Sequence, residues 1–132
     1  MTVYVLGIGS NENAEYQCRR MISAIDEAFG PIKVSELVVT RAVGINAPDY
    51  VNGVVCFESD INIEALKQWC KSIEGQLGRD RSRGLCAADI DLLLVFDWTE
   101  GQPTDEIIDQ INESWFRPLV VDLLSHHDVW VF

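Results

Sequence analysis

The sequence predicts an α+β fold in which strands and helices follow one another in the order β-α-β-β-α-β. Four short apolar runs have the β-branched composition of strands, and two longer stretches repeat apolar residues at helical spacing. No helical stretch separates the second run from the third, which is typical of an antiparallel hairpin. The length of 132 residues fits one compact domain, residues 1–132.

The first three elements are expected within residues 2–40. Thr2 to Ile8 is a β-branched run that stops in the turn formed by residues 7–11, so we expect a strand here. A helix is expected from about Ala14 to Phe29, and Gly30-Pro31 ends it. The apolar stripe of this helix consists of Cys18, Ile22, Ile25 and Phe29. Ile32 to Thr40 supplies the β-branched bulk of a second strand.

The second half of the pattern follows a loop from Arg41 to Pro48. Tyr50 to Glu58 is a strand of similar quality, and a helix that Gly78 terminates comes after Asn62. Its apolar residues repeat at helical spacing and are Leu66, Trp69, Cys70, Ile73 and Leu77. After a basic loop, Ala87 to Phe96 is the most clearly predicted strand of the chain. The complete order is the split βαβ arrangement of a ferredoxin-like fold.

The periodicity weakens beyond Trp98, where an acidic stretch begins. Pro118 is expected to open a short helix over Leu119 to Leu124, because proline suits the first turn of a helix. Val129 to Phe132 is expected to add a last strand.

Composition argues against two kinds of partner. No apolar run approaches the ~18–20 residues that cross a bilayer, so we expect no membrane-spanning segment. The 21 acidic and 10 basic residues give a net charge of −11, which would repel a nucleic-acid backbone. Residues 84–132 hold 10 of the acids and a single base, Arg117. Any anion site is therefore expected within residues 1–83.

The four cysteines contain no C-x-x-C pair and no histidine at metal-ligand spacing, so neither a zinc site nor a redox motif is expected. The first residues lack the basic and apolar regions of a signal peptide. We therefore expect reduced, mostly buried thiols in a cytoplasmic protein.

Asp89 and Asp91 are the most informative pair of polar residues. Residues i and i+2 of a strand point to the same face, so the two carboxylates are expected side by side. They repel each other unless a proton or a cation neutralises them, and hard oxygen ligands suit Mg²⁺ held together with substrate phosphates. The alternative is that both aspartates cap the end of a strand in solvent.

Three arginines, Arg79, Arg81 and Arg83, alternate just before these aspartates. Guanidinium groups neutralise phosphate oxygens, so arginines next to a Mg²⁺ site indicate phosphoryl transfer. The alternative is a solvated loop in which Asp80 pairs with its arginine neighbours.

Tyr50 and Asn52 are expected on one face of their strand. An asparagine amide has both donors and an acceptor, which match the edge of a fused heterocycle such as a pterin, and a tyrosine can pack on its ring. A strand edge with a hydrogen-bonded asparagine is the alternative. The turn Gly7-Ile8-Gly9-Ser10-Asn11 lacks the remaining residues of a phosphate-binding loop, so we interpret it as a strand-to-helix turn in which Ser10 or Asn11 caps or orients the next segment.

Four motifs in this order resemble the 6-hydroxymethyl-7,8-dihydropterin pyrophosphokinase family over about residues 2–97. They are Gly7-x-Gly9-Ser10-Asn11, Asp49-Tyr50-Val51-Asn52, Ile73-Glu74 followed by Gly78-Arg79-x-Arg81, and Ala88-Asp89-Ile90-Asp91-Leu92-Leu93-Leu94. The resemblance implies a ferredoxin-like fold and the transfer of the terminal pyrophosphate of ATP to the hydroxymethyl group of the pterin, in folate biosynthesis. It also implies two Mg²⁺ ions as cofactors.

The resemblance further implies roles for individual residues. Asp89 and Asp91 would bind both Mg²⁺ ions, and Asp91 would act in catalysis with the phosphate-facing Arg79 and Arg81. The remaining nucleotide contacts would come from Glu74 and from Arg83, the latter as a substitute for the arginine that the family carries shortly before the first aspartate. The pterin site would consist of Thr40, Val43, Tyr50 and Asn52, with Trp115 or Phe116 as an aromatic wall.

The chain departs from the family pattern at two places. Leu85-Cys86-Ala87-Ala88 stands where the family has an aromatic residue and then Pro-Arg, and acidic residues stand where it has Pro-His-Pro and Arg-x-Phe. A second hypothesis therefore remains open. The chain would then be a degenerate relative that binds a pterin-like ligand or a protein partner without chemistry.

Overall fold

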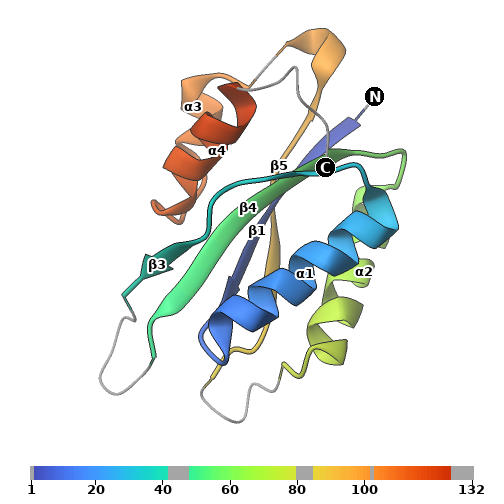
Figure 1. Cartoon of the computed structure of the whole chain (residues 1–132). Helices are drawn as coiled ribbons and strands as arrows, with labels where there is room; N and C mark the ends of the chain where they lie inside the picture. The colour runs from blue at the N-terminus through green and yellow to red at the C-terminus, as the bar shows by residue number, and fades with distance from the viewer. Residues whose placement is uncertain (1, 42–47, 80–84, 102, 126–132) are drawn as a thin grey trace.

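The computed structural model describes residues 2–41, 48–79, 85–101 and 103–125 (Figure 1). Within these residues it contains a sheet of five strands and four α-helices, so the predicted α+β class is confirmed. The elements follow the predicted β-α-β-β-α-β order, except that the second predicted strand is divided in two. The strand expected at Val129 to Phe132 lies outside the described residues.

The sheet is antiparallel throughout, with β1 (Thr2–Ser10) between two long neighbours. β4 (Tyr50–Glu58) pairs with one side of β1, and β5 (Asp89–Asp97) pairs with the other. β2 (Lys33–Val34) and β3 (Val38–Thr40) both pair with the far side of β4. The order β2-β4-β1-β5 places β4 between β1 and β2, which is the split βαβ arrangement of a ferredoxin-like fold.

The predicted strand from Ile32 to Thr40 is wrong in one respect, because the chain leaves the ladder between β2 and β3. The N–H of Ser35 still donates to the Val54 carbonyl at 2.9 Å, but the Ser35 hydroxyl accepts the Val54 N–H at 2.8 Å. Leu37 then packs over Gly53, where an added Cβ would lie 2.7 Å from the leucine side chain. A side-chain acceptor and a packed leucine thus interrupt a strand that composition alone predicts to be continuous.

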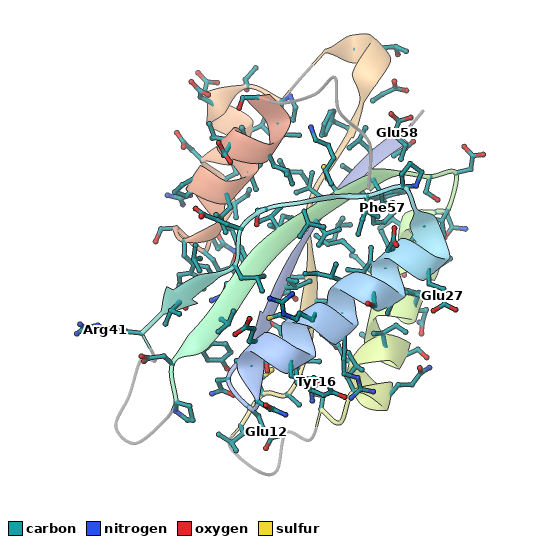
Figure 2. The ribbon with its side chains drawn as sticks, viewed as in Figure 1. Glu12, Tyr16, Glu27, Arg41, Phe57 and Glu58 are labelled. Carbon is teal, nitrogen blue, oxygen red and sulfur yellow. The ribbon has the colours of Figure 1, made fainter. Side chains whose placement is uncertain are left out.

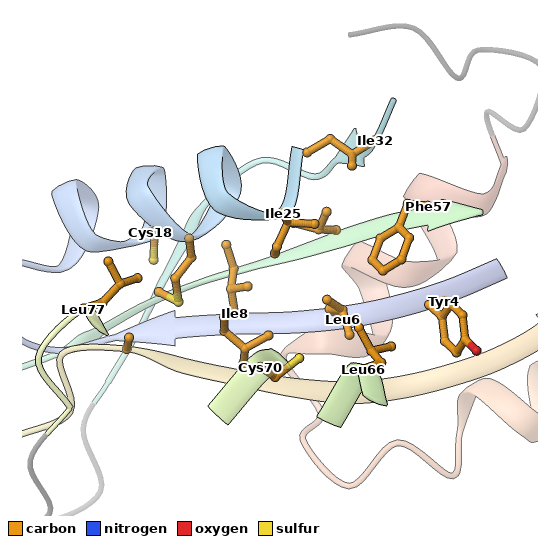
Figure 3. Close-up of a cluster of buried hydrophobic side chains, with 14 residues drawn as sticks. Tyr4, Leu6, Ile8, Cys18, Ile25, Ile32, Phe57, Leu66, Cys70 and Leu77 are labelled. Atoms are coloured by element: carbon orange, nitrogen blue, oxygen red, sulfur yellow. The ribbon is translucent and has the colours of Figure 1, made fainter. Parts of the chain in front are cut away.

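Helices cover both faces of the sheet. α1 (Ala14–Phe29) and α2 (Ile63–Gln76) pack on one face, and α3 (Asp105–Ile108) and α4 (Phe116–Ser125) pack on the other (Figure 1). Because alternate strand residues point to opposite faces, β1 contributes to two cores. The core beneath α1 and α2 includes Leu6 and Ile8 of β1 (Figure 3). No helix within the described residues is long and apolar enough to cross a membrane.

Several predicted boundaries agree with the structure. α1 has the predicted bounds, and α4 begins two residues before Pro118, which therefore lies in its first turn. The acidic stretch contains two elements that the sequence did not predict, α3 and the short 3₁₀ turn η2 (Trp98–Glu100). All four cysteines are free thiols and three of them are buried, as expected.

Gly78 ends α2 in a way that also fixes the next residue. Its φ of +94° lies in the region that favours glycine, and its N–H donates to the Gly75 carbonyl at 3.1 Å. The N–H of Arg79 donates to the Glu74 carbonyl at 3.0 Å. These two bonds form a Schellman motif, which places Arg79 next to the last turn of its own helix.

Candidate functional site

Two glycines of β1 leave room above the sheet on the side of α4. A Cβ at Gly7 would lie 2.7 Å from the ring of Phe116, and a Cβ at Gly9 would lie 2.5 Å from Oδ1 of Asn52. In the sheet Gly7 pairs with Asp91 and Gly9 pairs with Asp89. The glycines therefore admit an aromatic ring and an amide next to the two aspartates.

The first cavity, the α4-side cavity, has a volume of about 350 Å³ and lies between these strand ends and the start of α4. Seven residues that the sequence predicts for the site line it: Thr40, Tyr50, Asn52, Asp89, Asp91, Trp115 and Phe116. Arg41 and Glu113 line it as well. The side chain of Arg41 extends outward from the end of β3 (Figure 2). Val43 lies outside the described residues.

The amide of Asn52 is held in one orientation. The residue is 5% exposed, and its Nδ2 donates to the hydroxyl of Thr40 at 2.7 Å. Its Oδ1 faces Gly9 across the strand pair. This contact leaves a second N–H and the carbonyl oxygen of the amide for a ligand.

Aromatic rings border the same cavity. Trp115 is 41% exposed, whereas Phe116 is buried over Gly7, and the two ring centroids lie 5.9 Å apart. Tyr50, at the start of β4, is half-buried, and its burial raises the pKa of its hydroxyl. A flat heterocycle in this cavity would therefore meet apolar rings and a fixed amide.

The second cavity, the α2-side cavity, has a volume of about 430 Å³ and lies between α2 and the start of β5. Asp89 and Asp91 line this cavity as well as the first one. Glu74 and Arg79, both predicted for nucleotide binding, are also in its lining. Half of its other lining residues are polar or charged members of α2, namely Glu64, Lys67, Gln68 and Lys71.

Arg79 joins α2 to the start of β5. Its Nη1 lies 2.9 Å from Oε2 of Glu74 and 2.7 Å from Oδ1 of Asp89. Oε2 of Glu74 also accepts the N–H of Ile90 at 2.8 Å. Arg79 is therefore tied to the predicted metal ligand rather than solvated. Asp80, Arg81 and Arg83 lie outside the described residues, so their pairing remains a prediction.

Asp91 stands in an electrostatically unfavourable position when no cation is bound. Partial burial, and then the charge and hydrogen bond of Asp89, raise the pKa of Asp91 from 3.8 to about 7, although part of its side chain stays open to solvent. Glu74 and Glu113 act in the same direction. Neighbouring carboxylates that resist simultaneous ionisation fit a hard divalent cation. No group of three metal-binding side chains occurs within the described residues, so substrate or water oxygens would have to complete the coordination.

The lining residues that the sequence did not predict include Arg41, Lys67, Lys71 and Glu113. Lys67, Lys71 and Glu74 follow the spacing i, i+4 and i+7, which places them on one face of a helix. This spacing could have connected both lysines to the nucleotide prediction. Glu113 gave no such signal, because the chain around it has no periodicity.

A family model described as 7,8-dihydro-6-hydroxymethylpterin-pyrophosphokinase matches residues 5–123. No curated protein matches the sequence. Among solved structures, a Bacillus cereus protein described as an antibiotic biosynthesis monooxygenase is 18% identical, with a TM-score of 0.23 over 78% of this chain and 95% of the other. A likeness this low carries no argument about fold or function.

Proposed function

Because the chain belongs to the 7,8-dihydro-6-hydroxymethylpterin-pyrophosphokinase family, we propose that it transfers pyrophosphate from Mg-ATP to 6-hydroxymethyl-7,8-dihydropterin. The hydroxymethyl oxygen attacks the β-phosphorus of ATP, and the bond from that phosphorus to the oxygen bridging to the α-phosphate breaks. The products are the pterin pyrophosphate, AMP and one proton. Family membership supports the general role in folate biosynthesis.

One observation carries the proposal: Asp89 and Asp91 line both cavities. A ligand in the α4-side cavity and a ligand in the α2-side cavity would therefore meet at the same two carboxylates. Transfer between two bound substrates requires such a meeting point, because most of the catalytic effect comes from positioning and charge neutralisation.

The α4-side cavity is the proposed pterin site. The fixed amide of Asn52 pairs with the polar edge of the heterocycle, and Thr40 holds that amide in place. Tyr50, Trp115 and Phe116 supply apolar rings for its faces. Val43, which is also proposed for this pocket, lies outside the described residues.

The α2-side cavity is the proposed ATP site. Lys67 and Lys71 offer positive charge from α2, and Arg79 pairs with Glu74 and with Asp89 in the same cavity. We propose that Asp89 and Asp91 hold two Mg²⁺ ions. When bound, Mg²⁺ neutralises and orients the phosphate oxygens. Arg81 and Arg83 are proposed to add phosphate contacts from the neighbouring segment, outside the described residues.

The test is formation of AMP from ATP that depends on both the pterin and Mg²⁺. We expect the wild-type chain to form AMP and Asp91→Asn to lose at least about two orders of magnitude in rate, as is common when a group that stabilises developing charge is removed. Asp60→Asn is the matched control, because Asp60 is exposed and lines neither cavity. Equal rates in both variants would refute the assignment of Asp91.

A second candidate function, pterin binding without transfer, rests on the charges around the aspartates. Arg79 is already paired with Glu74 and Asp89, and Glu113 adds a carboxylate to the α4-side cavity. In this case the pterin would raise the melting temperature of the protein, because a ligand that binds the native state stabilises it. No AMP would form.

A further inference from the structure

The turn that follows β1 is fastened to the chain that enters β5. Oδ1 of Asn11 accepts the N–H of Cys86 at 2.6 Å, and the N–H of Asn11 donates to the Cys86 carbonyl at 2.9 Å. The hydroxyl of Ser10 lies 3.2 Å from the same carbonyl and 3.1 Å from the carbonyl of Glu12. Asn11 is 5% exposed and Ser10 is fully buried. Both backbone groups of Cys86 are thus held by one turn.

The side chain of Asn11 does not serve the helix that follows it. The residue before α1 is Asn13, in the left-handed conformation with φ 52°, and it makes no side-chain cap bond. The buried amide of Asn11 does not cap the nearby helix but binds a segment 75 residues away, so its role is long-range.

The fastened segment leads directly to the proposed reaction centre. Cys86 lies three residues before Asp89, which pairs with Gly9 in the sheet. Its thiol contacts the carbonyl of Ala88 at 3.5 Å, and Nη1 of Arg79 lies 3.4 Å from that carbonyl. Cys86 also lies next to Tyr50, which lines the α4-side cavity. Displacement of Cys86 would therefore reach both cavities.

We propose that Asn11 is a positioning residue of the reaction centre, which acts through the backbone of Cys86 to fix where Asp89 stands between the two cavities. The inference rests on the proposed function. In this proposal the Ser10-Asn11 turn neither binds phosphate nor caps a helix. Removal of a residue that orients a metal ligand without touching the metal typically lowers metal affinity by about 10–100-fold.

The test compares two asparagine variants that each lose an acceptor of one backbone N–H. Asn11→Ala removes the bond to Cys86, whereas Asn62→Ala removes the bond of 2.8 Å to the N–H of Ala65 at the start of α2. Binding of Mn²⁺ together with ATP, without pterin, is measured by the electron paramagnetic resonance signal of free Mn²⁺. We expect Asn11→Ala to weaken binding at least about tenfold per folded molecule and Asn62→Ala to leave it unchanged. Both variants should lose thermal stability.

Asn11→Asp retains the oxygen that accepts the Cys86 N–H and should recover most of the binding. If Asn11→Ala does not fold, Ser10→Ala tests the same attachment of the turn to Cys86, because it removes the hydroxyl near the Cys86 carbonyl. This variant is also expected to weaken binding. If the wild-type chain binds Mn²⁺ with ATP and the variant that folds binds it with the same affinity, the positioning role is overturned. Absence of binding in the wild-type chain would instead overturn the proposed function on which the inference rests.

Discussion

Asp89 and Asp91 have different surroundings although they share one strand face. Asp89 accepts a hydrogen bond from Arg79 at 2.7 Å, whereas Asp91 is raised in pKa to about 7 by partial burial and by its carboxylate neighbours. The spacing in the sequence predicts the shared face, because strand periodicity is local. It cannot predict which aspartate receives the arginine, since that depends on where the end of α2 meets β5.

Without metal, Asp91→Asn should stabilise the protein more at pH 8 than at pH 4.5. The pKa of Asp91 is higher in the folded protein than the ordinary value of 3.8, so its favourable contribution is complete below about pH 4 and is lost as the pH rises towards 7. An asparagine at this position does not ionise, so the variant keeps this stability as the pH rises. Urea unfolding in EDTA at both pH values measures the difference between variant and wild type.

Asp89→Asn is the comparison, because it weakens the ion pair with Arg79 while it removes the charge beside Asp91, so at pH 8 it should stabilise the protein less than Asp91→Asn does. If the difference in the free energy of unfolding between Asp91→Asn and the wild type is the same at pH 4.5 and pH 8, this account is contradicted.

Gly9→Ala should impair pterin binding while the fold persists. The new Cβ would lie 2.5 Å from Oδ1 of Asn52, so the amide must turn away and lose its bond to Thr40. We expect pterin affinity, followed by quenching of protein fluorescence, to fall at least about tenfold, which corresponds to about one hydrogen bond of ~1.4 kcal/mol.

The control is Gly53→Ala, which crowds Leu37 at 2.7 Å and lines neither of the two cavities. It should cost stability through overpacking but leave pterin affinity unchanged. Equal losses of affinity in both variants would attribute the effect to general destabilisation.

At the scale of elements, local signals predicted the long helices and strands well. α1 and β4 have the predicted bounds, because Gly30-Pro31 ends the apolar stripe of α1 and polar residues flank the β-branched run of β4. β2 and β3 were predicted as one strand, since the bond from Val54 to the Ser35 hydroxyl is a tertiary contact that composition does not reveal. α3 was missed because its four residues have no periodicity to detect.

The end of α2 provides a prediction at this scale. Gly78→Ala should destabilise the protein by about 1–2 kcal/mol, because an alanine is strained at the φ of +94°. It should also weaken Mg-ATP binding, since the same turn places Arg79 beside Glu74 and Asp89.

Gly75→Ala is the matched control in the same helix. Nothing lies within 4 Å of an added Cβ there, and alanine is a better helix former, so stability should rise by about 0.5–1 kcal/mol. Melting temperature and Mg-ATP affinity are measured for both variants. If Gly78→Ala binds Mg-ATP as the wild type does, the position of Arg79 does not depend on this turn.

Across the whole molecule, the order of elements predicted the layers but not the junction of the cavities. The β-α-β-β-α-β order was sufficient for the sheet and for α1 and α2 on one face. The sequence also brought Tyr50, Asn52 and the aspartates into one hypothesis. Trp115 or Phe116 was expected as an aromatic wall, but the sequence did not reveal that α4 closes a cavity on the opposite face, because the contact of Phe116 with Gly7 is tertiary. The extent of the domain, residues 1–132, stays a prediction.

The net charge of −11 gives the last prediction, which concerns the two substrates separately. Free ATP carries several negative charges and would approach Asp89, Asp91 and Glu74 in the α2-side cavity, so it should bind poorly in EDTA. The pterin is uncharged and meets mainly an amide and aromatic rings in the α4-side cavity. Calorimetric titrations with and without Mg²⁺ should therefore show ATP affinity rising at least about tenfold with the metal, the minimum that neutralisation of one close charge pair supplies near a protein surface. Pterin affinity should change less than about threefold. ATP binding of equal strength in EDTA would mean that cations of the chain itself, such as Lys67 and Lys71, already outweigh the carboxylates.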